Sequence, residues 1–187
     1  YLWKPINGYN RLSGIVVNGN GHTIRNMKVR GCTNSSVYGA GFIGDINGAI
    51  TIQDIAFDGA DVFFVNYAKP QFAGNVGGVV LGYTYGTTLF ENVSVTNSSI
   101  WGFGKIGILL GMGADPGVKV TFKDCVSKNN TIHAAYDMGG LAGMIQRGNG
   151  VDNASVENCT VENITVDYYE ECVDVQGKAT LKENDKN

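Results

Sequence analysis

The sequence predicts an all-β fold, a right-handed parallel β-helix (a solenoid) of about five coils with three short strands per coil. Two observations lead to this prediction. One stretch of six residues recurs about every 28 to 38 residues, and a second, glycine-bracketed stretch recurs between its copies. A self-similar unit of this length is typical of solenoids, in which each unit completes its core only by stacking on its neighbours. The sequence shows no helical periodicity.

The first stretch has fixed columns that suit stacked parallel strands. Its copies are residues 24–29, 52–57, 90–95, 122–127 and 156–161. The third column is always an amide or a carboxylate, and the fourth is always apolar: Asn26, Asp54, Asn92, Asp124 and Asn158, followed by Met27, Ile55, Val93, Cys125 and Cys159. We expect the apolar columns to fill the interior and the Asn/Asp column to form hydrogen bonds along the solenoid axis.

The second stretch is a short apolar run between glycines, and its copies are residues 41–44, 78–82, 107–111 and 140–143. We interpret each as a short strand whose flanking glycines allow a sharp turn or a close approach to a neighbour. A third short strand follows each Asn/Asp stretch, at residues 60–62, 98–100, 130–132 and 164–166. Together these segments give three strands per coil.

The repeats predict a single domain over residues 1–177, with an N-terminal segment 1–23, repeats 24–166 and a terminal strand 167–177. Residues 178–187 are strongly polar and predict a tail or a cap. Two insertions interrupt the repeats, at residues 63–75 and 112–119. In solenoids such insertions lie on one face, which is often the binding face.

The composition argues against several function classes. The net charge of -3 arises from 14 basic and 17 acidic residues. Because neither sign is clustered, the sequence has no basic patch of the kind that binds nucleic acid. No apolar run approaches the length of a membrane span. Metal-ligand spacings are absent, and the sequence gives no reason to expect a cofactor. Cys125 and Cys159 fall in the apolar column, either as small buried thiols or as a bridge between neighbouring coils.

The N-terminal segment carries a family resemblance. Trp3-Lys4-Pro5-Ile6, the later run 18–27 (Asn-Gly-Asn-Gly-His-Thr-Ile-Arg-Asn-Met) and the glycine-bracketed repeats resemble the GLUG-motif repeat proteins of bacterial, Bacteroidetes-type, cell surfaces. The resemblance covers roughly residues 3–166. It implies a parallel β-helix, export to the cell surface or outside the cell, and a role in adhesion or display within a larger multidomain protein. The family supplies no catalytic residues.

Catalysis has weak support in the sequence. Some polysaccharide lyases and glycoside hydrolases are also parallel β-helices. The fold alone therefore does not indicate whether the protein is an enzyme, and only the residues of a site can. Asp54 and Asp124 share their column with asparagines, which favours a turn role. Asp58 and Asp61 are weak candidates for a metal site, and the sequence singles out no catalytic residue.

Aromatic residues give the best indication of function. They occur in and after the long insertion and suit sugar rings or a protein surface, because each has an apolar body and several have a polar tip. The alternative is that they pack the insertion onto the solenoid. The candidates are Tyr67, Phe72, Tyr83, Tyr85, Trp101 and Phe103.

We therefore predict a non-catalytic, adhesin-like domain at the bacterial surface or secreted, which binds a glycan or a partner protein. The alternatives are a carbohydrate-active enzyme on the same scaffold and a structural stalk or spacer.

Overall fold

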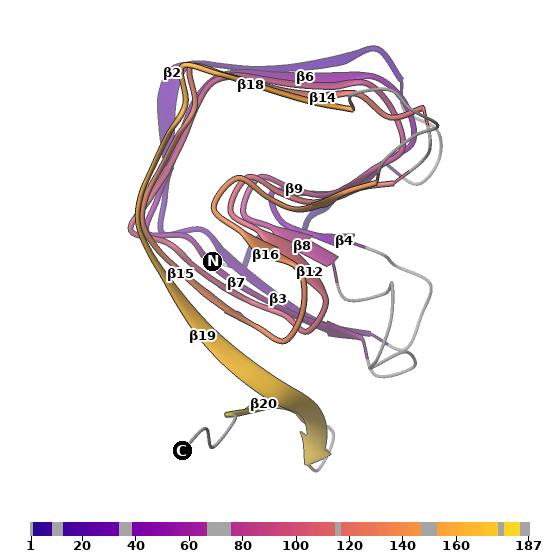
Figure 1. Cartoon of the computed structure of the whole chain (residues 1–187), viewed down its shortest axis with the longest axis vertical. Helices are drawn as coiled ribbons and strands as arrows, with labels where there is room; N and C mark the ends of the chain where they lie inside the picture. Colours follow the sequence, from indigo (N-terminus) through magenta and orange to yellow (C-terminus); the bar gives the residue numbers. More distant parts are fainter. Residues whose placement is uncertain are drawn as a thin grey trace.

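The chain forms an all-β parallel solenoid with three parallel sheets, as the sequence predicts, and it has about four turns where about five coils were expected (Figure 1). The structure is a computed structural model that describes residues 2–8, 13–33, 39–66, 76–114, 117–146, 153–175 and 178–183. No helix occurs in these ranges, and accordingly none of their segments is a membrane-spanning helix. The strands are β1 (Ile6–Gly8), β2 (Ile15–Arg25), β3 (Lys28–Thr33), β4 (Gly39–Ala40), β5 (Ile43–Ile46), β6 (Ile50–Asp58), β7 (Asp61–Asn66), β8 (Val76–Gly78), β9 (Leu81–Thr84), β10 (Thr88–Thr96), β11 (Ser99–Trp101), β12 (Lys105–Gly107), β13 (Leu110–Gly113), β14 (Val120–Lys123), β15 (Val126–Ala134), β16 (Met138–Gly139), β17 (Ala142–Ile145), β18 (Ala154–Glu157), β19 (Thr160–Val175) and β20 (Lys178–Glu183).

Each complete turn follows the same path. In Figure 1 the second turn runs along β6, bends, continues along β7, enters the interior as β8 and leaves it as β9. The other complete turns are β2 to β5, β10 to β13 and β14 to β17. Strand β1 precedes the first turn, whereas β18 and β19 begin a further one, so the ends of the solenoid are incomplete turns. Every pairing between turns is parallel.

The corners are made by residues in the left-handed backbone region. Asp54, Asn92, Asp124 and Asn158 form the first corner, with φ between 50° and 53°. Asn26, Gly59, Asn97, Asn129 and Asn163 form the second corner, also with positive φ. Asn, Asp and Gly tolerate this region better than other residues do, because it brings the Cβ of larger side chains close to the backbone. This requirement is the physical origin of the repeated Asn/Asp column.

The position assigned to Asn26 from the sequence is wrong by one corner. Arg25 lies opposite Asp58, so Asn26 corresponds to Gly59 and not to Asp54. The repeat pattern missed this because both corners share one signature, an Asn or Asp between a polar and an apolar residue. In addition, β2 carries a register shift between Asn18 and His22, which displaces the first corner of that turn.

Side-chain hydrogen bonds run along the axis at both corners; the bond at the first corner was expected from the sequence, and those at the second were not. At the first, Asn92 Nδ2 donates to Asp54 Oδ1 at 2.8 Å. At the second, Asn163 Nδ2 donates to Asn129 Oδ1 at 3.1 Å, and Asn129 Nδ2 donates to Asn97 Oδ1 at 3.4 Å. In each bond the later turn donates to the earlier one.

A second, buried ladder satisfies the backbone just after the second corner. The Ala60 N–H donates to Ser98 Oγ at 3.0 Å, and the Ser98 N–H donates to Asn130 Oδ1 at 2.9 Å. Asn130 Nδ2 also donates to Val95 O at 2.9 Å. A buried N–H without a partner is costly, so a polar side chain of the next turn replaces the backbone acceptor at this position.

Each glycine-bracketed run contains a chain reversal, and the strand expected there begins only after the bend, as β9 does at Leu81. Val79 and Val80 form the bend between β8 and β9, at the point where the chain turns back inside the solenoid (Figure 1). The glycines on either side allow two sheets to meet backbone to backbone. A Cβ added to Gly82 would lie 2.5 Å from Ala40 N and 2.6 Å from Gly44 O.

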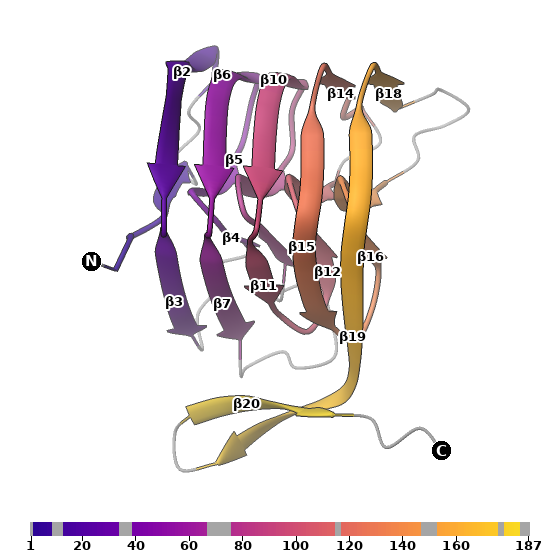
Figure 2. The same cartoon turned by 90° about the vertical axis from the view of Figure 1, so that its left-hand side faces the viewer.

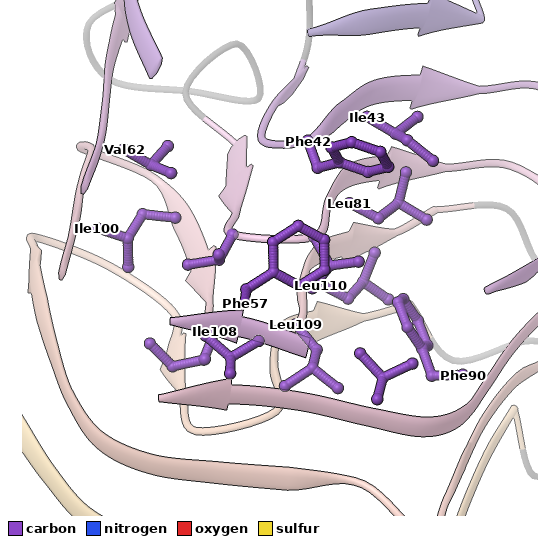
Figure 3. Close-up of a cluster of buried hydrophobic side chains, with 14 of the residues drawn as sticks. Phe42, Ile43, Phe57, Val62, Leu81, Phe90, Ile100, Ile108, Leu109 and Leu110 are labelled. Carbon is purple, nitrogen blue, oxygen red and sulfur yellow. The ribbon is translucent and has the colours of Figure 1, made fainter. Parts of the chain in front are cut away.

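The core lies between the outer wall and these reversals. Figure 3 shows Phe57, Val62 and Ile100 among the reversal residues Leu81, Ile108 and Leu109. Phe90 and Phe122 stack across neighbouring turns, with ring centroids 5.0 Å apart and an interplanar angle of 10°. Burial of these columns supplies the main driving force for stacking the turns.

The cysteines in the apolar column are free thiols. Cys125 is buried and Cys159 is partly buried. Burial raises the pKa of the Cys125 thiol to about 11. The Cys125 N–H donates to Cys159 Sγ at 3.4 Å, so the two residues occupy neighbouring turns as expected, without the bridge that the sequence left open.

The C-terminal segment leaves the stack as a hairpin. Strand β19 runs without interruption from Thr160 to Val175 and pairs antiparallel with β20, which lies within the segment predicted as a polar tail or cap. Figure 2 shows this hairpin beneath the turns.

Candidate binding face

The outer face of β3, β7, β11, β15 and β19 gathers polar and aromatic side chains. These strands lie side by side on one wall of the solenoid (Figure 2). Val62, Ile100 and Ile132 point into the core and are fully buried. Because side chains alternate along a strand, the residues on either side of them point outward.

One outward row, which we call the aromatic row, crosses five strands. The parallel register places its members directly opposite one another: Arg30, Phe63, Trp101, His133 and Asp167. Trp101 and His133 stack with ring centroids 3.5 Å apart and an interplanar angle of 13°. The stack covers one face of the indole, and the other face is turned toward the strand that carries Phe63.

An open depression of about 400 Å³ lies on the Phe63 side of the indole. It is lined by Arg30, Asp61, Phe63, Ser99 and Trp101. Two aromatic rings, a guanidinium, a carboxylate and a hydroxyl therefore surround one hollow. This composition, apolar surfaces with a few oriented polar groups, is typical of small-molecule and sugar sites.

The charges around the depression are fixed by short contacts. Arg30 forms an ion pair with the Asp61 carboxylate, and Arg30 Nη1 donates to Asp61 O at 2.9 Å. On the far side of the stack, His133 Nδ1 lies 3.0 Å from Asp167 Oδ2. Burial lowers the pKa of His133, and the Asp167 charge offsets that effect in part. Burial thus favours the neutral form of the imidazole that stacks on Trp101.

The structure brings one predicted aromatic residue, Trp101, into this depression. Tyr83 and Phe103 are buried, at 7% and 4% exposure, so their rings pack inside the protein. Tyr83 and Tyr85 form a separate cluster with Met112 and Ala114, at strands β9 and β13 and the residues that follow them. Of the six residues predicted from the sequence, two lie outside the described residues, namely Tyr67 and Phe72.

The two weak metal candidates both have other partners. Asp58 accepts hydrogen bonds from Asn97 at 2.8 Å, Thr96 at 3.0 Å and Arg25 at 2.7 Å. The bonds from Asn97 and Thr96 lower the pKa of Asp58, and Arg25 adds to this effect. Asp61 is paired with Arg30. Within the described ranges, His, Cys, Asp and Glu do not gather in groups of three or more that would suit a metal ion.

Sequence reasoning missed Arg30, Phe63 and His133 as members of this face. A usable signal was present for Phe63 and His133, because each follows an aligned third-strand segment by one residue, as Trp101 and Asp167 also do. Arg30 follows no such segment, and only the pairing of β3 with β7 places it in the aromatic row. The sequence pattern placed Phe63 in the long insertion, as a loop residue, whereas Phe63 lies in strand β7.

No protein-family model, curated protein or solved structure matches the chain.

Proposed function

We propose that the chain is a non-catalytic binding domain of a secreted or cell-surface bacterial protein of the GLUG-motif type, and that the depression beside Trp101 holds a glycan. The observation that carries the proposal is the composition of that depression. The indole and Phe63 offer apolar surfaces to the C–H groups of a sugar ring. Asp61, Arg30 and Ser99 offer hydrogen-bond partners for its hydroxyl groups.

The arrangement favours binding over bond cleavage. Glycoside hydrolysis needs two carboxyl groups placed on opposite sides of one bond. The single carboxylate that lines the depression is Asp61, which is paired with Arg30. A rigid sheet also holds the contact residues in place without a ligand, which lowers the entropy cost of binding.

Glycan-array and polysaccharide-binding measurements on the whole chain test the proposal. We expect a glycan class to bind, and Trp101→Ala to raise its Kd about tenfold or more, because loss of one stacked ring costs about 1.5 kcal/mol or more. Trp101→Phe restores part of the affinity. The matched control is Tyr136→Ala, which removes an exposed aromatic side chain that packs on Phe103, away from the depression.

Three outcomes would contradict the proposal. Equal binding by wild type and Trp101→Ala would remove the depression from the site. Release of reducing ends or unsaturated products from a polysaccharide panel would favour the enzyme alternative. Absence of binding to glycans and to candidate host proteins alike would favour the spacer.

A further inference from the structure

The C-terminal end of the solenoid exposes apolar side chains whose counterparts are buried one turn earlier. Val156 and Val166 are 58% and 49% exposed, whereas Phe122 and Ile132, which lie opposite them, are 1% and 0% exposed. Val161 is 49% exposed in the same way. Among the described residues, β18 pairs with β14 alone, so its other edge offers free backbone donors and acceptors.

The N-terminal end presents a matching edge. Strand β2 pairs with β6 alone in the described part of the chain. Val17 and Ile24 lie in the same apolar columns as Val156 and Val161, through the register that links all turns. A second copy added to the C-terminal end in that register would set Val17 on Val156 and Ile24 on Val161. The two columns, which are apolar except for Ser127, would then continue into the added copy.

The two ends also carry opposite charges in the same columns. Arg25 shares its column with Glu162, and Arg30 shares its column with Asp167. Inside the chain, neighbouring turns already form such pairs: Arg25 Nη1 lies 2.7 Å from Asp58 Oδ2, and Lys128 Nζ lies 3.0 Å from Glu162 Oε2. The end-to-end register therefore creates two acid–base pairs and matches no two like charges in these columns.

The incomplete turns at the two ends complement each other. Strand β1 stands one turn ahead of β2 in the sheet β1-β5-β9-β13-β17. At the other end, β18 and β19 extend one turn beyond β17. In a stack, β1 of the added copy would lie at the free edge of β17. The corner ladder would also continue, with Asn26 Nδ2 of the added copy donating to Asn163 Oδ1, in the direction that the internal bonds follow.

We propose that copies of this chain stack head to tail, the N-terminal edge of one on the C-terminal end of the next, to form an extended solenoid. Such a contact uses two different surfaces and does not close, so it produces open chains of copies and not a symmetric dimer. Leu2 and Trp3 lie against Lys28 at the N-terminal edge, so a stack that extends past the second corner, as the Arg30–Asp167 pair requires, has to displace them. Among the described residues, the edge of β2 requires no such displacement.

Sedimentation velocity of the whole chain over a range of concentrations tests the stacking. We expect a series of species, dimer, trimer and longer, that grows with concentration. Glu162→Lys sets a lysine against Arg25 of the next copy, and Arg25→Glu sets a glutamate against Glu162. Each variant alone should shift assembly to at least tenfold higher concentration. Ser94→Lys, which adds a charge on the outer face of a middle turn, should assemble as the wild type does.

A mixture of the two end variants provides the decisive result. In it, the lysine introduced by Glu162→Lys meets the glutamate introduced by Arg25→Glu at one junction. The opposite junction keeps Glu162 with Arg25, so we expect assembly to return to the wild-type level. Circular dichroism confirms that each variant is folded. A chain that stays monomeric at every concentration would overturn the proposal. So would a closed dimer, or end variants that assemble like the wild type or are not rescued by mixing.

Discussion

At the scale of single residues, the fold depends on side chains that replace missing backbone acceptors. A left-handed residue at each second corner redirects the chain, and the next N–H then lacks a backbone partner in the adjacent turn. Ser98 and Asn130 supply the acceptor from one turn further on. The Asn130 side chain, which is 1% exposed, makes three hydrogen bonds. It accepts from the Ser98 N–H and donates to Val95 O and Ser127 Oγ.

We therefore expect Asn130→Ala to lower the free energy of unfolding by about 2–3 kcal/mol, because a buried N–H of Ser98 and a buried carbonyl of Val95 lose their partners. Urea denaturation followed by circular dichroism measures the change. The matched control is Asn129→Gly, at the preceding, exposed corner position. Glycine keeps the positive φ there, so a loss of no more than about 0.5 kcal/mol is expected. Equal losses for both variants would argue against the buried ladder.

At the scale of elements, the inward reversals distinguish this solenoid from a simple three-sided coil. Strands β8 and β9 approach the neighbouring turns so closely that side chains do not fit between the backbones. Glycine loses more backbone conformational entropy on folding than other residues do, which destabilises the folded state. Burial of the Val79, Val80 and Leu81 side chains offsets this loss. The reversals thus fill the interior with both backbone and apolar side chains.

Gly82→Ala should destabilise the protein by about 3 kcal/mol or more, because the added Cβ would overlap backbone atoms of Ala40 and Gly44 that have no room to move. The midpoint of thermal unfolding reports the effect. Gly113→Ala is the matched control. A Cβ at that position would meet Val120 Cγ2 at 3.2 Å and Val118 Cγ1 at 3.6 Å, both on side chains that can adjust. If Gly82→Ala were as stable as Gly113→Ala, the close backbone packing would be wrong.

At the scale of the whole molecule, the chain is a linear stack in which each turn contacts mainly its neighbours. Stability in such a stack is a sum of terms for the turns and for the contacts between them. Strand β10 lies between β6 on one side and β14 and β15 on the other, whereas β18, within the described part of the chain, has a partner on one side. A strand at the centre of the stack is therefore stabilised by a neighbouring turn on each side, and a strand at the end by a turn on one side.

Hydrogen exchange should follow this gradient. We expect the amides of β10 to exchange at least about tenfold more slowly than those of β18, since local opening requires less free energy at an end with one neighbour. Exchange at low protein concentration, read by mass spectrometry, measures both strands. Repetition at high concentration should slow exchange in β18 where copies stack. Uniform protection from β10 to β18 at low concentration would contradict the linear picture.

The sequence by itself determined the class of fold and the Asn/Asp column whose members from Asp54 onward make the first corners. Left-handed corners accept few residue types, so Asn and Asp recur at fixed intervals and reveal the period. Close backbone packing accepts glycine alone, so the reversals are also visible as a pattern. The sequence showed that these glycines mark turns or close approaches, and that Trp101 belongs among the candidate binding residues.

The tertiary structure alone decided which corner Asn26 occupies and which residues share the aromatic row. The two corners share one local sequence pattern, so the sequence alone does not tell them apart. Strand pairing does, because register depends on contacts between turns and not on a single segment. The same holds for Arg30, Phe63, Trp101 and His133, which lie far apart in the sequence and side by side across the sheet. Burial likewise separated Tyr83 and Phe103 from Trp101, since an aromatic residue faces the core or the solvent according to which neighbour covers it.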